Sequence, residues 1–375
     1  MKAADFRVMV LEGSARERGH AHGEALRDSI HSLVGEWKEN IYQDLRMDPD
    51  QFLAELVQET HFIPTIERWT PSLLEEVQGI AEGAGLDFNT IFARQLSDEE
   101  PWFRLEKKLG RSWGFVENCS AIGCNPRGNA PAIVAENMDT PAYYDGYQVL
   151  LHIKYPDSPL EVFMFTIAGK INLAGMSNAP LAICCNTVLP LNYAKDGLPE
   201  DFVVRGALEQ ADWNAAVDFM CRLPHASGQN YLMGGPERVI CLECSANQVV
   251  EYQNAANVER VWHTNHPLIN DDCSIHEQRL ERMTEQEQAT WRDGSGARSN
   301  THARMNYLNR ELRQSNDALT VACIREHLSS HEAPVCHHSE QKITLGCLIM
   351  ELGDPPVLHL SPGPPCCTPF ASHRF

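Results

Sequence analysis

Cys119 is the residue of this chain whose type and position best fit chemistry. It follows Asn118 in the stretch VENCSA, where the helical pattern of the first part of the chain gives way to strands. A free thiol has a pKa of about 8.5 and supplies little nucleophilic thiolate at pH 7 without a nearby base or positive charge. If the backbone is cut before Cys119, its freed α-amino group, which titrates at about 8, can take the thiol proton. The stretch is therefore a candidate self-cleavage site and nucleophile. The alternative is a small buried cysteine at the start of a strand.

Two polar residues further along the chain could assist such a nucleophile. Asp139 ends the stretch ENMD, and a carboxylate beside the nucleophile can hold an α-ammonium group in place. Alternatively, Asp139 is a turn residue before Thr140. Asn265 lies in HTNH, after the apolar segment VERVW. Its amide is a suitable donor for the oxyanion of a tetrahedral intermediate, because it has no charge to desolvate.

Other chemistries find less support in the residues. His263 and His266, with CHH at 336–338 and Cys119 to Cys124, could be offered as zinc ligands, but the spacing of these residues is unsuitable. A cysteine–histidine dyad could use Cys119 and one of the 16 histidines, but the local signatures of such proteases are absent. GxxxxGK[ST], GxGxxG after a strand and GxSxG are also absent. We therefore expect no metal and no other cofactor.

The composition is that of an ordinary globular protein. The chain has 375 residues, of which 43% are hydrophobic and 22% charged, and its formal charge of −20 disfavours nucleic acid as a partner. Thirteen cysteines, an odd number, favour reduced thiols. The N-terminal sequence does not look like a secretory signal, and no stretch approaches the ~18 apolar residues of a membrane span. The sequence predicts a soluble, cytoplasmic protein without a membrane partner.

The order of the predicted elements favours an α+β fold. We expect helices up to about residue 115 after a first strand at 6–11, then short strands from residue 119. Helices are expected again at 202–223 and 271–328, with an exposed loop at 285–300, and strands end the chain. Strands without strict alternation with helices predict mostly antiparallel sheets. Asp87 and Asp212 should cap helices, and small residues at 79–84 should let another element approach closely.

Several segments together resemble one known family. They are RERGHAHGEALRDSI, EEVQGIAEGAGLDFNTIF, NCSAI, AENMD, LAGMSNAPLAICCN, VICLECS, VWHTNHPL, SNTHARMNYL and LHLSPGPPC. The chain resembles the acyl-coenzyme A:isopenicillin N acyltransferases, which are cysteine N-terminal-nucleophile hydrolases, and more distantly bile-salt hydrolases and penicillin V acylases. The likeness runs nearly from end to end.

The resemblance implies a fold and a mechanism. The fold is a four-layer αββα sandwich with two mostly antiparallel sheets between helical layers. Autocatalytic cleavage before Cys119 would give a helical small chain, 1–118, and a strand-rich large chain, 119–375, joined as a heterodimer in one compact fold, with a possible higher homo-oligomer. Cys119 would be the nucleophile, Asp139 the catalytic aspartate, and the Asn265 amide and Asn186 backbone N–H the oxyanion donors. The implied activity is amide hydrolysis through an acyl-enzyme. Acyl transfer to an amine, and a catalytically silent binding protein, are the alternatives.

Some positions depart from the family pattern. Asn118 replaces the usual glycine before the nucleophile, Ser177 stands where many relatives have asparagine, and a Ser-Arg pair of the acyltransferase is unmatched near Gln341. Coenzyme A use and penicillin synthesis are therefore not inferred.

The substrate pocket is predicted from fewer residues. Glu136 occupies the position of an arginine in bile-salt hydrolases, so an acidic wall would favour a substrate with a free ammonium group, unless Glu136 points away or pairs with an arginine. Asn137, Tyr143, Tyr144 and Asn230 are further substrate-binding candidates that also fit plain strand and loop roles. Arg304 is expected to be structural, paired with a carboxylate under the sheet.

Overall fold

Two β-sheets form the centre of the protein. The computed structural model describes residues 6–107, 118–254, 259–285, 288, 300–313 and 319–375. In the described ranges one sheet has eight strands in the order β1-β4-β5-β6-β7-β8-β9-β10, and the other has six in the order β11-β2-β3-β12-β13-β14. The eight-stranded sheet comprises β1 Arg7–Leu11, β4 Gln148–Lys154, β5 Glu161–Ile167, β6 Ala174–Ser177, β7 Leu181–Thr187, β8 Gln229–Gly234, β9 Val239–Cys244 and β10 Val249–Tyr252. The six-stranded sheet comprises β11 Arg260–His263, β2 Asn118–Cys124, β3 Ile133–Pro141, β12 Lys342–Glu351, β13 Val357–Ser361 and β14 Ala371–His373.

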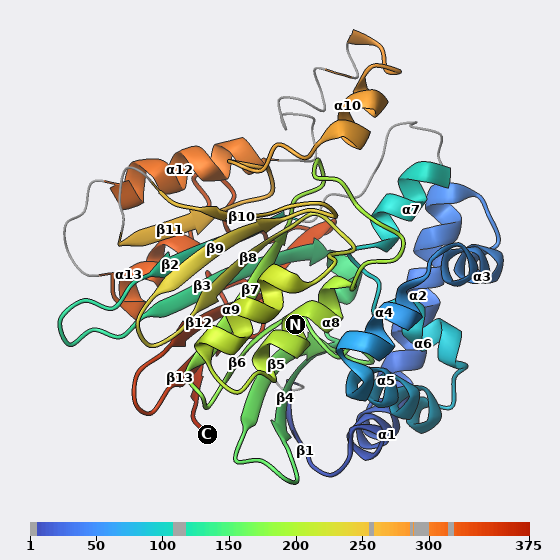
Figure 1. The fold of residues 1–375 in the computed structure, drawn as a ribbon, viewed down its shortest axis with the longest axis horizontal. Helices are drawn as coiled ribbons and strands as arrows, with labels where there is room; N and C mark the ends of the chain where they lie inside the picture. Colours follow the sequence, from blue (N-terminus) through green and yellow to red (C-terminus); the bar gives the residue numbers. More distant parts are fainter. Residues whose placement is uncertain (1–5, 108–117, 255–258, 286–287, 289–299, 314–318) are drawn as a thin grey trace.

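Helices cover the outer faces of both sheets (Figure 1). On the side of the eight-stranded sheet lie α1 Ala15–Ala25, α2 Arg27–Leu45, α3 Pro49–Glu59, α4 Phe62–Trp69, α5 Pro71–Ala84, α6 Phe88–Arg94, α7 Glu100–Lys107, α8 Glu200–Leu208 and α9 Trp213–Arg222. On the side of the six-stranded sheet lie α12 Thr301–Arg313 and α13 Val321–Leu328, whereas α10 Ser274–Leu280 projects from the body. No helix within the described ranges is long and apolar enough to cross a bilayer.

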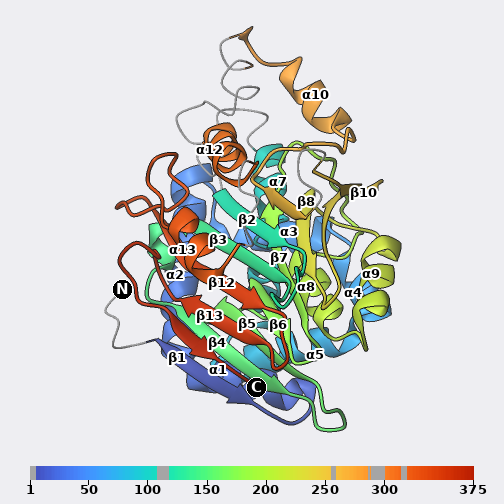
Figure 2. The same ribbon diagram turned by 90° about the vertical axis from the view of Figure 1, so that its left-hand side faces the viewer.

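Three hydrophobic cores lie between the four layers. One joins the two sheets through residues such as Phe165 of β5 and Leu348 of β12. A second lies between the eight-stranded sheet and its helices, and a third, around Trp262 and Leu308, lies between the six-stranded sheet and α12 and α13. Figure 2 shows β12 and β13 layered over β4 and β5. The expected αββα sandwich is confirmed.

Most expected elements are present. The paired strands are antiparallel except β1 and β4, which are parallel. The helix expected over 202–223 is instead two helices, α8 and α9, because the Asp212 side chain accepts the Ala215 N–H at 2.9 Å and starts a new helix. Asp87 caps α6 as expected. Most of the loop expected at 285–300 lies outside the described residues.

Glycines on two helices bring α1 and α5 into backbone contact. A Cβ atom on Gly79 of α5 would lie 2.2 Å from the Arg16 carbonyl oxygen of α1, and one on Gly19 of α1 would lie 1.9 Å from the Glu76 carbonyl oxygen. Both distances are far inside van der Waals contact. The small residues predicted at 79–84 therefore serve this close helix crossing.

Gly79→Ala should lower the free energy of unfolding by roughly 2–4 kcal/mol, because α1 and α5 must separate to admit the methyl group. The matched control is Gly35→Ala in α2, where no atom lies within 4 Å of the new Cβ. That change should leave stability equal or raise it by up to about 1 kcal/mol. Urea unfolding measures both. Equal effects of the two substitutions would contradict the crossing.

Candidate active site

Cys119 lies near the start of β2, between β11 and β3, and is 7% exposed. The next residue, Ser120, points toward the helix layer, because its hydroxyl accepts a hydrogen bond from Arg304 of α12 at 3.0 Å. Ala121 belongs to the core between the sheets. Since side chains alternate along a strand, the Cys119 thiol faces the eight-stranded sheet.

Asn265, just after β11, connects three parts of the site. Its side-chain Oδ1 accepts the Cys119 backbone N–H at 2.8 Å, and its Nδ2 donates to the Thr187 carbonyl oxygen at 3.0 Å. Its own backbone N–H donates to the Thr301 hydroxyl at 2.8 Å. Asn265 thus reaches the nitrogen atom of the bond that self-cleavage would break.

Arg304 holds the backbone of Cys119 from the helix side. Its guanidinium is fully buried and donates to the Cys119 carbonyl oxygen and, at 2.7 Å, to Asn265 Oδ1. Burial lowers the pKa of Arg304 to about 10, against the opposing charges of Asp139 and Cys119, so it stays charged near neutral pH. The sequence argument gave Arg304 a purely structural role and missed this contact. A usable signal was its spacing from Thr301, which places both residues on one face of α12.

Asp139 lies at the end of β3, in register with Asn118. Its carboxylate is fully buried and accepts a hydrogen bond from the Thr344 hydroxyl, and His337 Nε2 lies 3.7 Å from its Oδ2. Burial raises the pKa of Asp139 to about 7, although the positive charges of Lys342 and Arg304 lower it. In the uncut chain this acid therefore titrates near neutral pH.

Glu136 and two predicted asparagines form a buried polar row between the sheets. Asn186 of β7 donates through Nδ2 to Glu136 Oε1 at 3.4 Å, and Asn230 of β8 donates through Nδ2 to Asn186 Oδ1 at 2.7 Å. Glu136 is paired across the strands with Ala121, so both side chains face the interior between the sheets. Burial, followed by the charges of Glu136 and Cys119, raises the pKa of the Cys184 thiol. The row therefore lies on the side of β2 and β3 that the Cys119 thiol faces.

The structure corrects the expectation for Asn137. In β3 it is paired with Ser120 and faces the helix layer, where its Nδ2 donates to the carbonyl oxygens of Leu328 and Val335 at 2.7 and 2.9 Å. Because strand side chains alternate, Asn137 points to the face opposite Glu136. A substrate-binding role is not supported by this placement.

Tyr143 and Tyr144 also lie apart from the polar row. They belong to the short 3-10 helix Ala142–Tyr144, and their rings are in contact, with centroids 4.3 Å apart. Arg94 of α6 donates to the Tyr144 hydroxyl at 3.4 Å. Together with residues of α2 and α7, both tyrosines line a small hollow. Their predicted role in substrate binding stays a prediction.

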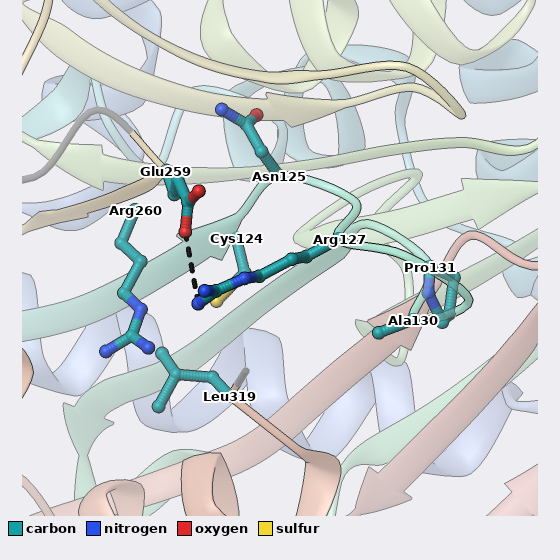
Figure 3. Close-up of a pocket in the computed structure, with 8 residues that line it drawn as sticks. All are labelled: Cys124, Asn125, Arg127, Ala130, Pro131, Glu259, Arg260 and Leu319. Carbon is teal, nitrogen blue, oxygen red and sulfur yellow. Dashed lines mark ion pairs between the residues drawn. The ribbon is translucent and has the colours of Figure 1, made fainter. Parts of the chain in front are cut away.

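A second hollow lies at the opposite end of β2. Figure 3 shows it around Cys124 and Arg127, and Arg127 forms an ion pair with Glu259 at 3.4 Å. Since a strand rises about 3.3 Å per residue, five residues separate it from Cys119 by roughly 16 Å. This hollow is therefore not part of the candidate site.

The histidines of HTNH are engaged elsewhere. His263 Nε2 contacts Glu243 Oε1 at 2.8 Å, and His266 Nδ1 contacts the Thr301 hydroxyl at 2.8 Å. Their partners are an acidic side chain and a hydroxyl of the protein itself.

Comparison with known proteins gives a match over more than half of the chain. The family described as acyl-coenzyme A:6-aminopenicillanic acid acyl-transferase matches residues 126–341. These residues include Asp139, Asn186, Asn265 and Arg304, whereas Cys119 lies just before them. The 40 kDa form of acyl-coenzyme A:6-aminopenicillanic-acid-acyltransferase from Emericella nidulans is 25% identical over 271 residues, 72% of this chain and 71% of that protein.

Solved structures show a weaker likeness. An N-acylethanolamine-hydrolyzing acid amidase ortholog from Caenorhabditis elegans has 16% identity and a TM-score of 0.43, covering 63% of this chain and 93% of that one. A conjugated bile acid hydrolase from Clostridium perfringens has 9% identity and a TM-score of 0.42, covering 68% and 97%. Similarity at this level carries no information on activity.

We expect the uncut chain to lose stability as pH rises, because Asp139 must ionise inside the fold. The pKa of Asp139 is about 7 in the folded chain against an ordinary value of 3.8. The stability that comes from keeping Asp139 neutral is therefore fully present below about pH 4. It is lost as the pH rises through about 7, on the order of 4 kcal/mol in total. Urea unfolding of Cys119→Ala, which keeps the chain uncut, measures this loss.

The control for this prediction is the double variant Cys119→Ala/Asp139→Asn, in which the contribution of Asp139 is absent and all other titrating groups are retained. Its stability should fall less steeply between about pH 4 and pH 7. Identical pH profiles of the two proteins would contradict the raised pKa of Asp139.

Proposed function

Since the chain belongs to the acyl-coenzyme A:6-aminopenicillanic acid acyl-transferase family, we propose that it is a self-processing cysteine amidohydrolase that cleaves an N-acyl or aminoacyl amide through an acyl-Cys119 intermediate. One observation carries the proposal. The backbone N–H of Cys119 is bonded to the Asn265 side chain, and its carbonyl oxygen to the buried Arg304. Polar side chains thus bind both the backbone N–H and the carbonyl oxygen of a cysteine at the start of a strand.

Processing would begin on the bond between Asn118 and Cys119. The thiol attacks the Asn118 carbonyl carbon, a C–S bond replaces the C–N bond, and the nitrogen of Cys119 leaves as an amine. Water then hydrolyses the thioester, which gives Asn118 a carboxyl group and restores the thiol. The products are the chains 1–118 and 119–375. Because β1 is paired with β4 and α1–α7 pack on the eight-stranded sheet, the two chains stay together as a heterodimer.

The processed enzyme would use its new N-terminus as the base. The α-amine takes the thiol proton, the thiolate attacks the substrate amide carbonyl, and the leaving amine receives that proton. Water resolves the acyl-enzyme. Asn265 Oδ1, already bonded to this nitrogen in the uncut chain, and the Asp139 carboxylate orient the ammonium form. As oxyanion donors, the Asn265 amide and the Asn186 backbone N–H stay predictions. The Asn265 Nδ2 donates to the Thr187 carbonyl here.

Acyl transfer is the second candidate, because the Emericella nidulans relative is named as an acyltransferase. It would use the same residues up to the acyl-enzyme and differ only in the acceptor, an amine in place of water. Partition of one acyl-enzyme between water and added amines distinguishes the two activities.

The buried Glu136 points to the substrate class. Its carboxylate lies on the same side of β3 as the interior that the Cys119 thiol faces, and it accepts a hydrogen bond from the Asn186 amide at 3.4 Å. A carboxylate buried in this way favours a cationic partner, because an opposite charge offsets its desolvation. We therefore propose amides that carry a free ammonium group, such as aminoacyl or β-alanyl amides.

The wild-type protein should separate into two chains that split before Cys119, whereas Cys119→Ala should remain whole. Intact-mass analysis of both purified proteins measures this. A wild-type chain that stays uncut and still hydrolyses amides would remove the α-amine as the base.

Glu136→Gln should reduce kcat/KM for amides with a free amine by roughly 10–100-fold, and should change it less than about threefold for matched amides without the amine. The loss should be selective because the substitution removes the negative charge that would pair with the ammonium group of the substrate. The control is Glu251→Gln on β10, which removes a carboxylate that pairs with Arg238 at 3.5 Å near the surface. Equal losses for both substrates would show that Glu136 has only a structural role.

A further inference from the structure

Two segments far apart in sequence bring five cysteines and histidines together beside the six-stranded sheet. The first connects α13 to β12, and the second is the turn after β13 that begins at Pro364. They form two groups that share Cys366, one of His331, Cys336 and Cys366 and one of His338, Cys366 and Cys367. Within each group the nitrogen and sulfur atoms lie within 4.8 Å of one another. Thiolate and imidazole are the ligands that Zn²⁺ prefers.

The spacing of these atoms is close to that of a zinc site. Zinc–sulfur bonds of about 2.3 Å and zinc–nitrogen bonds of about 2.0 Å place tetrahedral ligand atoms roughly 3.5–4 Å apart. Ligand atoms at the 4.8 Å limit would need to approach by about 1 Å, which rotation of the exposed His331 and Cys366 side chains allows. His331 and Cys366 are exposed, so an ion could reach them from solvent.

A hydrogen bond to the backbone fixes the tautomer of His331. Its Nδ1 lies 3.1 Å from the Cys336 carbonyl oxygen. A carbonyl oxygen only accepts, so Nδ1 carries the proton and the lone pair is on Nε2. A histidine that donates one ring N–H to a backbone carbonyl and offers the other nitrogen is typical of zinc sites. This bond is an observation independent of the spacing.

Cys336 lies in surroundings that suit a metal-bound thiolate. It is 1% exposed, and its thiol lies against the Cys366 thiol. The Cys366 backbone N–H and the Thr344 hydroxyl both lie against its sulfur. The Cys366 N–H would stabilise a thiolate, and a cation would offset the cost of burying its charge.

We propose that His331, Cys336 and Cys366 bind one Zn²⁺ ion. Binding forms two zinc–sulfur bonds and one zinc–nitrogen bond, and both thiols release their protons to solvent. The fourth position faces solvent on the side of the exposed Cys366.

Zinc bound here would hold in place two residues beside Asp139, His337 and Thr344. His337 follows the ligand Cys336 directly, and its Nε2 lies 3.7 Å from Asp139 Oδ2. The Thr344 hydroxyl donates to Asp139 and contacts Cys336 as well. The site therefore connects to the proposed catalytic aspartate, but metal binding itself does not depend on the proposed activity.

The test is the zinc content of the full-length protein, purified with a thiol reductant, incubated with Zn²⁺ and desalted. Wild type should hold about one zinc per chain, and His331→Ala and Cys366→Ser should each lose most of it. Cys366 is exposed, so its substitution does not disturb the core. Cobalt(II) in place of zinc should give a thiolate charge-transfer band in wild type that is absent in Cys336→Ser/Cys366→Ser.

Three controls separate this site from other thiols. Cys221→Ser on α9, Cys119→Ala and Cys367→Ser should each keep about one zinc. Chelation should lower the Tm of wild type by roughly 3 °C and leave that of Cys366→Ser unchanged. Wild-type zinc content in His331→Ala or Cys366→Ser, loss of zinc in Cys119→Ala, or a metal-free wild type with a Cys336–Cys366 disulfide would overturn the proposal.

Discussion

The candidate site depends on the hydrogen bonds that the buried guanidinium of Arg304 donates. Taking a charge out of water costs several kcal/mol, and only well-placed acceptors offset this cost. Arg304 finds them in the Cys119 carbonyl, the Ser120 hydroxyl and the Asn265 side chain. These acceptors come from β2 and from the segment after β11, and the guanidinium comes from α12. The need to satisfy one cation therefore fixes three elements around the nucleophile.

The uncut chain is electrostatically incomplete at this place. Asp139 is buried with a pKa of about 7, although Lys342 and Arg304 both favour its charged form. Cleavage before Cys119 would create an ammonium group on the residue after Asn118, and Asn118 is in register with Asp139. A positive charge so close to a carboxyl group lowers the pKa of that group. The cut would thus supply a positive charge beside Asp139, which would couple processing to the ionisation of this proposed catalytic aspartate.

Candidate residues of the site could be identified from the sequence more reliably than the direction in which their side chains point. Strand patterns and turn residues were enough for mostly antiparallel sheets and for Asp139 and Asn265 as candidates, whereas the four-layer arrangement of two sheets came from the family resemblance. Asn137 was misjudged because one residue decides the face of a strand: Glu136 points between the sheets and Asn137 toward α13. The contact of Arg304 depends on how α12 packs across β2, and local sequence does not report that. Cys336 was considered as a zinc ligand and set aside on spacing, since its partner Cys366 lies far along the sequence and only the fold brings the two together.

Asn118, the residue before the proposed nucleophile, shows how the fold would constrain self-cleavage. Asn118 is 1% exposed and belongs to β2, paired with Asp139 of β3. The bond to be cut therefore lies inside a strand, where the backbone is extended and the thiol of Cys119 points across the sheet. For the thiol to reach the Asn118 carbonyl carbon, the backbone at residue 118 must turn out of this geometry. Glycine turns at little steric cost, but asparagine has a Cβ atom and a buried amide to move. Asn118 should therefore affect the rate of the cut more than the chemistry that follows it, because the mature enzyme no longer contains that bond.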